Sequence, residues 1–195
     1  LWRPSLAYTW SLYAGLIQWW QIGNESDSAV VWDDRLPYVI ERVKKEMSSV
    51  MEQPQLILPT NLLKATDDSA PKAESVSAYA LHIPSSIPSA SLAESWNTQG
   101  MTKLPLWITL ETPSETAYPR LARLADLTKR LVLTRMQNVS TVFIAQPWKS
   151  DDKGNLSPKE DYLIFRTVAD LLGDTTGIGM MVLDGRAQCA AFDRS

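Results

Sequence analysis

The feature that most constrains this chain is the alternation of short apolar runs with longer segments of helical length. Five runs have the length and composition of buried strands: 18–22, 56–58, 76–81, 105–110 and 139–145. Segments that suit helices flank and separate them: 2–14, 36–52, 89–98, 117–137 and 158–172, with a polar connection or short helix at 67–74. Strands that alternate with helices in this way predict a parallel sheet with helices outside it, an α/β fold.

Local signals support several of these segments. The segment 36–52 carries apolar side chains at helical spacing with charged ones between them, as in a helix that packs on one face. Ser89 is a predicted N-cap, and Ser157 is another, with Pro158 at the first position of the helix that follows. The polar stretch 146–155 is predicted to be a loop.

The pattern changes near the end of the chain, where two short apolar runs follow each other. The runs 178–183 and 187–192 surround Asp184 and Gly185, a pair typical of a tight hairpin turn. We therefore expect a β-hairpin there, as the possible start of a C-terminal β-sandwich. The predicted division is a barrel portion at 1–175 and the β element at 176–195.

Composition narrows the classes of function. A hydrophobic content of 45% is enough for a buried core, and the net charge of −3 is spread over mixed charges, so neither nucleic acid nor a membrane surface is an expected partner. The apolar runs are far shorter than the roughly 20 residues of a membrane-spanning helix. One histidine and one cysteine, Cys189, cannot form a zinc cluster, so a metal site would have to rest on carboxylates. No metal or cofactor is expected. Cys189 is expected to be buried and inert. The compartment is left open; a secreted or periplasmic location is compatible with the sequence.

Polar side chains follow four of the predicted strands. The pair Asn24 and Glu25 follows the first strand, His82 the third, and Glu111 the fourth. The fifth strand runs into the segment 146–148, with Gln146 and Trp148. In a parallel β/α barrel the loops at the carboxyl ends of the strands carry the functional groups, so these side chains are the candidate site.

Strand alternation gives an independent expectation for Glu111. Residues two apart share a face of a strand, so Trp107 and Thr109 lie on the same face as Glu111. The opposite face is purely aliphatic and suits contact with the outer helices. We therefore expect the Glu111 side chain to point toward the barrel axis, and the same reasoning places Glu25 and His82 on inward faces.

The run Trp20-Gln21-Ile22-Gly23-Asn24-Glu25 resembles the strand-four motif of the retaining clan A glycoside hydrolases, in which a Trp-rich strand ends in Asn-Glu. Three strands further on, the run 104–111 ends in Glu111, where the clan places its second glutamate. The resemblance covers about residues 2–172. It implies a (β/α)8 TIM-type barrel represented by about its last five strands, four to eight.

The resemblance also implies roles for the candidate residues. Glu25 would be the acid/base and Glu111 the nucleophile, in a retaining mechanism that uses two carboxyl groups about 5 to 5.5 Å apart. Asn24, His82, Gln146 and Trp148 would contact the substrate, an oligosaccharide or polysaccharide. Trp148 would form the floor of a sugar subsite. The first three strands would come from a missing N-terminal half or from another chain, because a part-barrel alone exposes sheet edges.

Other interpretations stay open at this point. The chain could be a barrel that binds carbohydrate without catalysis, or a Rossmann-like nucleotide enzyme, although it has no G-x-G-x-x-G loop. Individual residues also have structural alternatives. Glu111 could be a solvated acid in the first turn of a helix, His82 a structural hydrogen-bonding group, and Trp148 a core residue.

Overall fold

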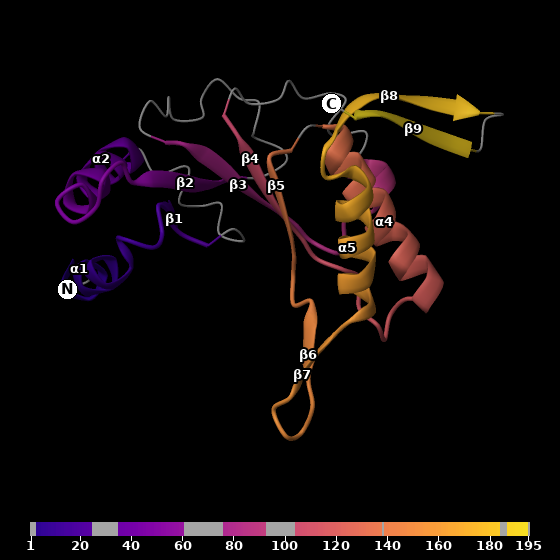
Figure 1. Cartoon of the computed structure of the whole chain (residues 1–195), viewed down its shortest axis with the longest axis horizontal. Helices are drawn as coiled ribbons and strands as arrows, with labels where there is room; N and C mark the ends of the chain where they lie inside the picture. Colours follow the sequence, from indigo (N-terminus) through magenta and orange to yellow (C-terminus); the bar gives the residue numbers. More distant parts are fainter. Residues whose placement is uncertain are drawn as a thin grey trace. The chain divides into compact units, whose positions relative to one another are not determined.

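The computed structural model describes residues 3–24, 35–60, 76–92, 104–137, 139–183 and 187–194. The chain divides into two compact units, which are treated separately below. The first comprises Leu1–His82 and Met101–Leu106, and the second comprises Ile83–Gly100 and Trp107–Ser195. Figure 1 shows the elements of both units in sequence colours. In the described residues no helix is long and apolar enough to cross a membrane.

The first unit is built around two neighbouring parallel strand pairs. Its elements are α1 (Arg3–Tyr13), β1 (Trp19–Gln21), α2 (Leu36–Met47), β2 (Gln55–Thr60) and β3 (Ala78–Ile83), the last residue of which belongs to the second unit. Strand β2 pairs in parallel with both β1 and β3. It is buried from Leu56 to Thr60, as expected for a central parallel strand covered on both faces. The apolar face of α2 is buried too, at Leu36, Ile40, Val43 and Met47.

The second unit combines a parallel strand pair, two long helices and two hairpins. Its elements are β4 (Leu106–Leu110, the first residue of which belongs to the first unit), α4 (Arg120–Met136), β5 (Thr141–Ile144), β6 (Trp148–Ser150), β7 (Leu156–Pro158), α5 (Glu160–Leu172), β8 (Thr175–Leu183) and β9 (Ala187–Arg194). Strands β4 and β5 pair in parallel. Helices α4 and α5 lie side by side in Figure 1 and line a common apolar pocket together with Val142 of β5.

The long sheet has the order β1-β2-β3-β4-β5, so each strand pairs with the next one along the chain. The described strand pairs of this sheet are all parallel. This arrangement confirms the α/β class and the five predicted strands. The expected helix at 89–98 is helical over 89–92, and its remainder lies outside the described residues, as does the predicted polar connection at 67–74.

The prediction of a loop at 146–155 was wrong at 148–150, which form β6, whereas 151–155 form a turn as expected. Strands β6 and β7 pair antiparallel there, with Lys149 opposite Ser157. The turn is closed by Asp151, whose carboxylate accepts hydrogen bonds from the backbone N–H groups of Lys153 and Asn155 at 2.9 and 2.8 Å. Sequence patterning missed this hairpin because its strands are short and all their side chains are exposed.

Two helix starts and one helix end differ in the structure from their predicted positions. Ser157 and Pro158 belong to β7, so α5 begins later, at Glu160. Helix α4 begins at Arg120 and not at 117, because Pro119 is extended and proline disfavours helical backbone in the residue before it. Helix α2 ends at Met47, earlier than the predicted residue 52.

The predicted C-terminal hairpin is confirmed as β8 and β9, which pair antiparallel with an irregularity between Gly177 and Gly179. The division of the chain at residue 175 stays a prediction. Cys189 is exposed, so the expectation that it is buried was wrong. Strands β8 and β9 form a two-stranded sheet, and a ribbon of this kind cannot bury every apolar side chain that it carries.

The close contact between β8 and α4 depends on a glycine, Gly177. A Cβ atom built on Gly177 would lie 2.8 Å from the Met136 Cα and 2.9 Å from its carbonyl oxygen. We expect Gly177→Ala to lower the free energy of unfolding by roughly 1–3 kcal/mol, because backbone atoms must move to accept the methyl group. Urea denaturation followed by circular dichroism measures the change.

Gly179→Ala is the matched control in the same strand, because a Cβ atom there meets nothing within 4 Å. Its effect is expected to stay within about 0.5 kcal/mol. Equal effects of the two substitutions would show that strand propensity, and not the contact with α4, determines the cost at Gly177.

Candidate functional site

The residues predicted from the first strand lie at the end of β1. The backbone stays hydrogen-bonded to β2 through Ile22, whose N–H donates to the Ile57 carbonyl at 3.0 Å. Gly23 then turns the chain with φ 90°, and the Gln21 side chain donates to its carbonyl at 3.1 Å. Asn24 follows this turn. Glu25 lies outside the described residues, so its predicted position beside Glu111 stays a prediction.

His82 is the penultimate residue of β3. It is half-buried, whereas its neighbours Leu81 and Ile83 are buried at 1% and 0% exposure. Ala78 and Ala80, which share its face, are small and buried. This pattern is consistent with the predicted face of β3, on which two small residues, Ala78 and Ala80, precede the polar His82.

Glu111 follows β4, and the predicted alternation of that strand is confirmed. Leu106, Ile108 and Leu110 are buried, while Trp107 and Thr109 are partly exposed. Glu111 is partly exposed as well. The residue follows the strand directly and precedes α4 by a long loop, so it is not an acid in the first turn of a helix.

Two hydrogen bonds connect Glu111 to the end of β3. Its backbone N–H donates to the Ile83 carbonyl at 3.0 Å, which extends the sheet by one residue beyond β4. Its carboxylate oxygen Oε2 accepts a hydrogen bond from the Ser85 backbone N–H at 3.2 Å. The carboxylate therefore has a fixed anchor at the carboxyl edge of the sheet, where a β/α-barrel enzyme presents its functional groups.

A buried arginine holds both strand ends in place. Arg130 of α4 is only 1% exposed, and its Nη1 donates to the Pro84 carbonyl at 3.2 Å and to the Glu111 carbonyl at 3.3 Å. Its Nη2 donates to the Ser85 carbonyl at 3.1 Å. The Arg130 guanidinium thus contacts both sides of the hydrogen bond between the Ser85 N–H and the Glu111 carboxylate. It binds carbonyl groups of the turn that contains Ser85 and the carbonyl group of Glu111 itself.

Asp126, one helical turn before Arg130, completes this arrangement. Its Oδ2 accepts from the Arg130 Nε at 2.6 Å, and its Oδ1 accepts from the Ser89 backbone N–H at 3.2 Å. Sequence reasoning missed both residues. The available signal was a charged residue at 130 beside Leu127 and Leu131, on the apolar face of an amphipathic helix, where an arginine needs buried partners.

Gln146 and Trp148 follow β5. Gln146 is exposed and has a φ of 46°, and so turns the chain out of the sheet into β6. Trp148 is 46% exposed, which excludes the interpretation that it is only a core residue. Its ring lies against Tyr162 of α5, with the centroids 5.0 Å apart and the planes tilted by 34°. The indole is supported on one side while much of its surface remains accessible.

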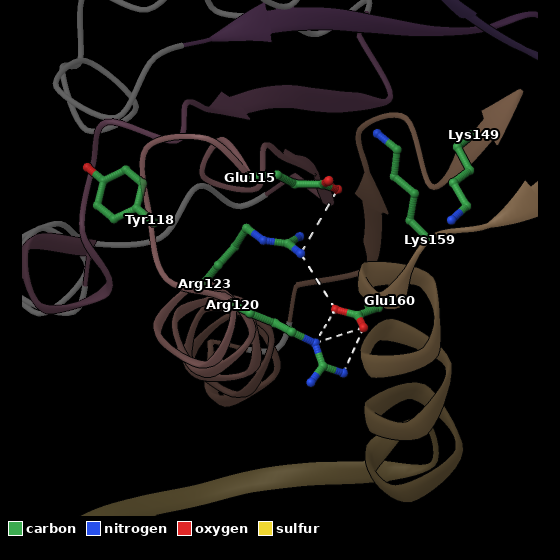
Figure 2. Close-up of a pocket in the computed structure, with 7 residues that line it drawn as sticks. All are labelled: Glu115, Tyr118, Arg120, Arg123, Lys149, Lys159 and Glu160. Atoms are coloured by element: carbon green, nitrogen blue, oxygen red, sulfur yellow. Dashed lines mark hydrogen bonds and ion pairs between the residues drawn. The ribbon is translucent and has the colours of Figure 1, made fainter.

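A pocket of about 370 Å³ lies where α4, α5 and the β6–β7 hairpin begin. Figure 2 shows its lining, which is Glu115, Tyr118, Arg120, Arg123, Lys149, Lys159 and Glu160. It is a second feature of the carboxyl edge that the sequence did not predict, because its residues come from three separate stretches of the chain, 115–123, 149 and 159–160.

Ion pairs connect the two helices beside this pocket. Arg120 contacts both carboxylate oxygens of Glu160, at 2.7–2.8 Å. Arg123 is bonded to Asp161 and lies 3.7 Å from Glu160. The hydrogen bond from Arg120 lowers the pKa of the Glu160 carboxyl, and the same hydrogen bond raises the pKa of Arg120. Within the described ranges, no group of three or more His, Cys, Asp or Glu side chains could hold a metal ion.

Comparison with known proteins supports the fold. No protein-family model matches the chain, and no curated protein matches it. A solved structure, that of a family 39 glycoside hydrolase from the gut symbiont Bacteroides cellulosilyticus WH2, is similar with a TM-score of 0.62 at 17% sequence identity. The similarity covers 98% of this chain and 48% of that one, so the chain spans about half its length. The chain therefore shares the fold of about half of that solved structure.

The role of Arg130 can be tested through stability. Arg130→Met removes the buried charge and leaves Asp126 and three carbonyl groups without their partner, so we expect a loss of about 3–5 kcal/mol in the free energy of unfolding. Arg166→Met on α5 is the control, because Arg166 pairs with Asp170 at 3.7 Å while 68% exposed. Its effect should stay within about 0.5 kcal/mol. Equal losses in urea denaturation would contradict the assigned role.

The Arg120–Glu160 pair predicts a pH dependence. The pKa of Glu160 is lower in the folded protein than the value of about 4.3 of a free glutamate. Its contribution to stability is therefore fully present above that value and is lost as the pH falls through the folded pKa. The difference in unfolding free energy between the wild type and Glu160→Gln should shrink from pH 7 to pH 3 in urea titrations. A constant difference would show that the charge of Glu160 does not matter.

Proposed function

We propose that this chain is part of a retaining O-glycoside hydrolase of the β/α-barrel type, which acts on an oligosaccharide or polysaccharide. Glu111 is the nucleophile and Glu25 the acid/base. The observation that supports this most directly is the position of Glu111 at the carboxyl end of β4, with one carboxylate oxygen anchored by the Ser85 N–H at 3.2 Å. The fold shared with a family 39 glycoside hydrolase supports the same class of reaction.

The anchored carboxylate suits a nucleophile. The hydrogen bond from the Ser85 N–H to Oε2 restricts rotation of the planar carboxylate and so helps to fix the position of Oε1. In the proposed mechanism Oε1 attacks the anomeric carbon. Glu25 gives its proton to the leaving glycosidic oxygen, and a covalent glycosyl ester forms on Glu111. A water molecule then attacks the anomeric carbon while Glu25 takes its proton, which releases the sugar with retained configuration.

Four further residues contact the substrate in this proposal. Trp148 offers a supported and accessible indole face for a sugar ring, and Gln146 beside it is exposed. Asn24 and His82 supply hydrogen bonds to hydroxyl groups from the ends of β1 and β3. The remaining strands of the barrel come from an N-terminal half of the same protein or from another chain.

The first test is catalysis by the protein in its natural length. A panel of 4-nitrophenyl glycosides identifies a substrate, and Glu111→Gln is then expected to lower kcat at least about 10³-fold, because the ester can no longer form. Azide added to Glu111→Gly should restore turnover, since it attacks the anomeric carbon, displaces nitrophenolate and gives a glycosyl azide of inverted configuration.

Glu41→Gln on the exposed face of α2 is the control and should retain the wild-type rate. An undiminished rate in Glu111→Gln would overturn the assignment of the nucleophile. Binding of oligosaccharides with no hydrolysis of any glycoside by the wild type would instead indicate a barrel that binds carbohydrate without catalysis.

A further inference from the structure

We infer that the pocket shown in Figure 2 binds an anionic group, a carboxylate or sulfate, carried by the saccharide substrate. This inference rests on the proposed function and deepens it, because it names a substrate class. Four observations support it: the place of the pocket, the charge of its lining, a buried donor without a partner, and the two helices that begin there.

The pocket lies at the edge of the unit that carries Glu111. Glu115 and Tyr118 belong to the loop that follows Glu111, before α4 begins. Lys149 belongs to β6, next to Trp148, and Lys159 follows β7. The hairpin that carries Trp148 therefore also supplies residues of the pocket, although Trp148 and Lys149, as successive residues of a strand, point to opposite faces.

The lining is basic although the chain as a whole is acidic. Four basic and two acidic side chains line the pocket, whereas the whole chain has a net charge of −3. Glu160 is occupied by Arg120, and Arg123 is bonded to Asp161. Lys149 and Lys159 have no ion pair in the part of the chain that the structure describes. Neither ammonium group is held in such a pair within the described residues, although, besides the hydrogen bond from Arg120, the Lys149 charge helps to lower the pKa of Glu160.

Arg123 adds a donor that the described structure does not satisfy. The side chain is only 6% exposed, and its Nε–H is buried without a hydrogen-bond partner. In Figure 2 its guanidinium extends between Glu115 and Glu160. A buried N–H without an acceptor is costly, and Arg123 is one of the residues that line the pocket.

Both long helices begin at the pocket. Helix α4 has Pro119 as its N-cap and α5 has Lys159, and neither N-cap side chain bonds the first-turn N–H groups. The positive end of a helix dipole favours an anion. The first turn of α5 already holds Glu160 and Asp161, whereas the first turn of α4 holds no acid.

The size of the pocket favours a sugar unit over a small ion. A volume of about 370 Å³ falls in the range of roughly 300–1,000 Å³ that is usual for small-molecule sites. A sulfate or phosphate ion alone would leave most of that space to water. Tyr118, 51% exposed, gives the pocket an aromatic surface that suits a sugar ring.

Isothermal titration calorimetry tests the inference with the natural-length protein carrying Glu111→Gln, so that no probe is consumed. The probes are a glucuronate-containing tetrasaccharide and its carboxyl-reduced form, and a sulfated tetrasaccharide and its desulfated form. One charged probe should bind about tenfold more tightly than its uncharged form, through charge-assisted hydrogen bonds. A preference within the glucuronate pair would identify the bound group as a carboxylate, and a preference within the sulfated pair would identify it as a sulfate.

The double substitution Lys149→Gln with Lys159→Gln should reduce this preference to about twofold or less, because it removes the unpaired charges. Lys153→Gln is the matched control. Lys153 lies in the exposed turn of the same hairpin and does not line the pocket, so the preference should persist there.

Three outcomes would overturn the inference. Equal binding of charged and uncharged probes would show that the ion pairs serve only to hold the helices. A preference that survives the double substitution would locate anion recognition elsewhere. Inorganic sulfate that binds as tightly as the charged saccharides would indicate a site for simple anions. Hydrolysis of glycosides is measured separately, so a charge preference without hydrolysis would refute the proposed function and leave the pocket assignment intact.

Discussion

The guanidinium of Arg130 is the interaction on which the carboxyl edge of the second unit depends. Backbone carbonyls beyond the end of a strand have lost their ladder partners, and three of them, from Pro84, Ser85 and Glu111, accept hydrogen bonds from this one side chain. Burying a charge is unfavourable unless it is paired and fully hydrogen-bonded, and the Asp126 carboxylate supplies the charge partner. As a result the Ser85 N–H lies where it can bind the Glu111 carboxylate.

The same helix repeats this arrangement at its other end. Arg123 stands seven residues before Arg130, two turns along, and therefore on the same face of α4. It pairs with Asp161 in the first turn of α5, where an acid is also favoured by the helix dipole. One helix face thus holds the ends of two strands through Arg130 and the start of the next helix through Arg123. The pocket and the Glu111 carboxylate both owe their geometry to α4.

The sequence predicted those parts of the fold that periodicity encodes. The strand that precedes Glu111 alternates in burial as predicted, because its aliphatic face packs in the core and its other face does not. The β6–β7 hairpin could not be predicted in this way, because its strands bury no apolar side chain and its turn depends on hydrogen bonds to Asp151. Arg130 and the residues of the pocket escaped for a related reason. Arg130 leaves a local signal as a charge on the apolar face of α4, but the carbonyl groups that it contacts lie far along the chain. The partners of Arg120 and Arg123 lie far along the chain too, on α5.

The partly exposed face of β4 bears on what completes the site. The register places Phe143 of β5 beside Thr109, on the face that leads to Glu111. Phe143 is 43% exposed, and its ring lies 5.7 Å from that of Trp107. Both faces of a parallel sheet are normally covered, and here α4 and α5 cover the opposite one. An aromatic pair left accessible beside a candidate nucleophile is what a barrel interior presents when only some of its strands are in place. In the barrel that we propose, further strands would bury Phe143 and Trp107 and exclude water from the space in front of Glu111.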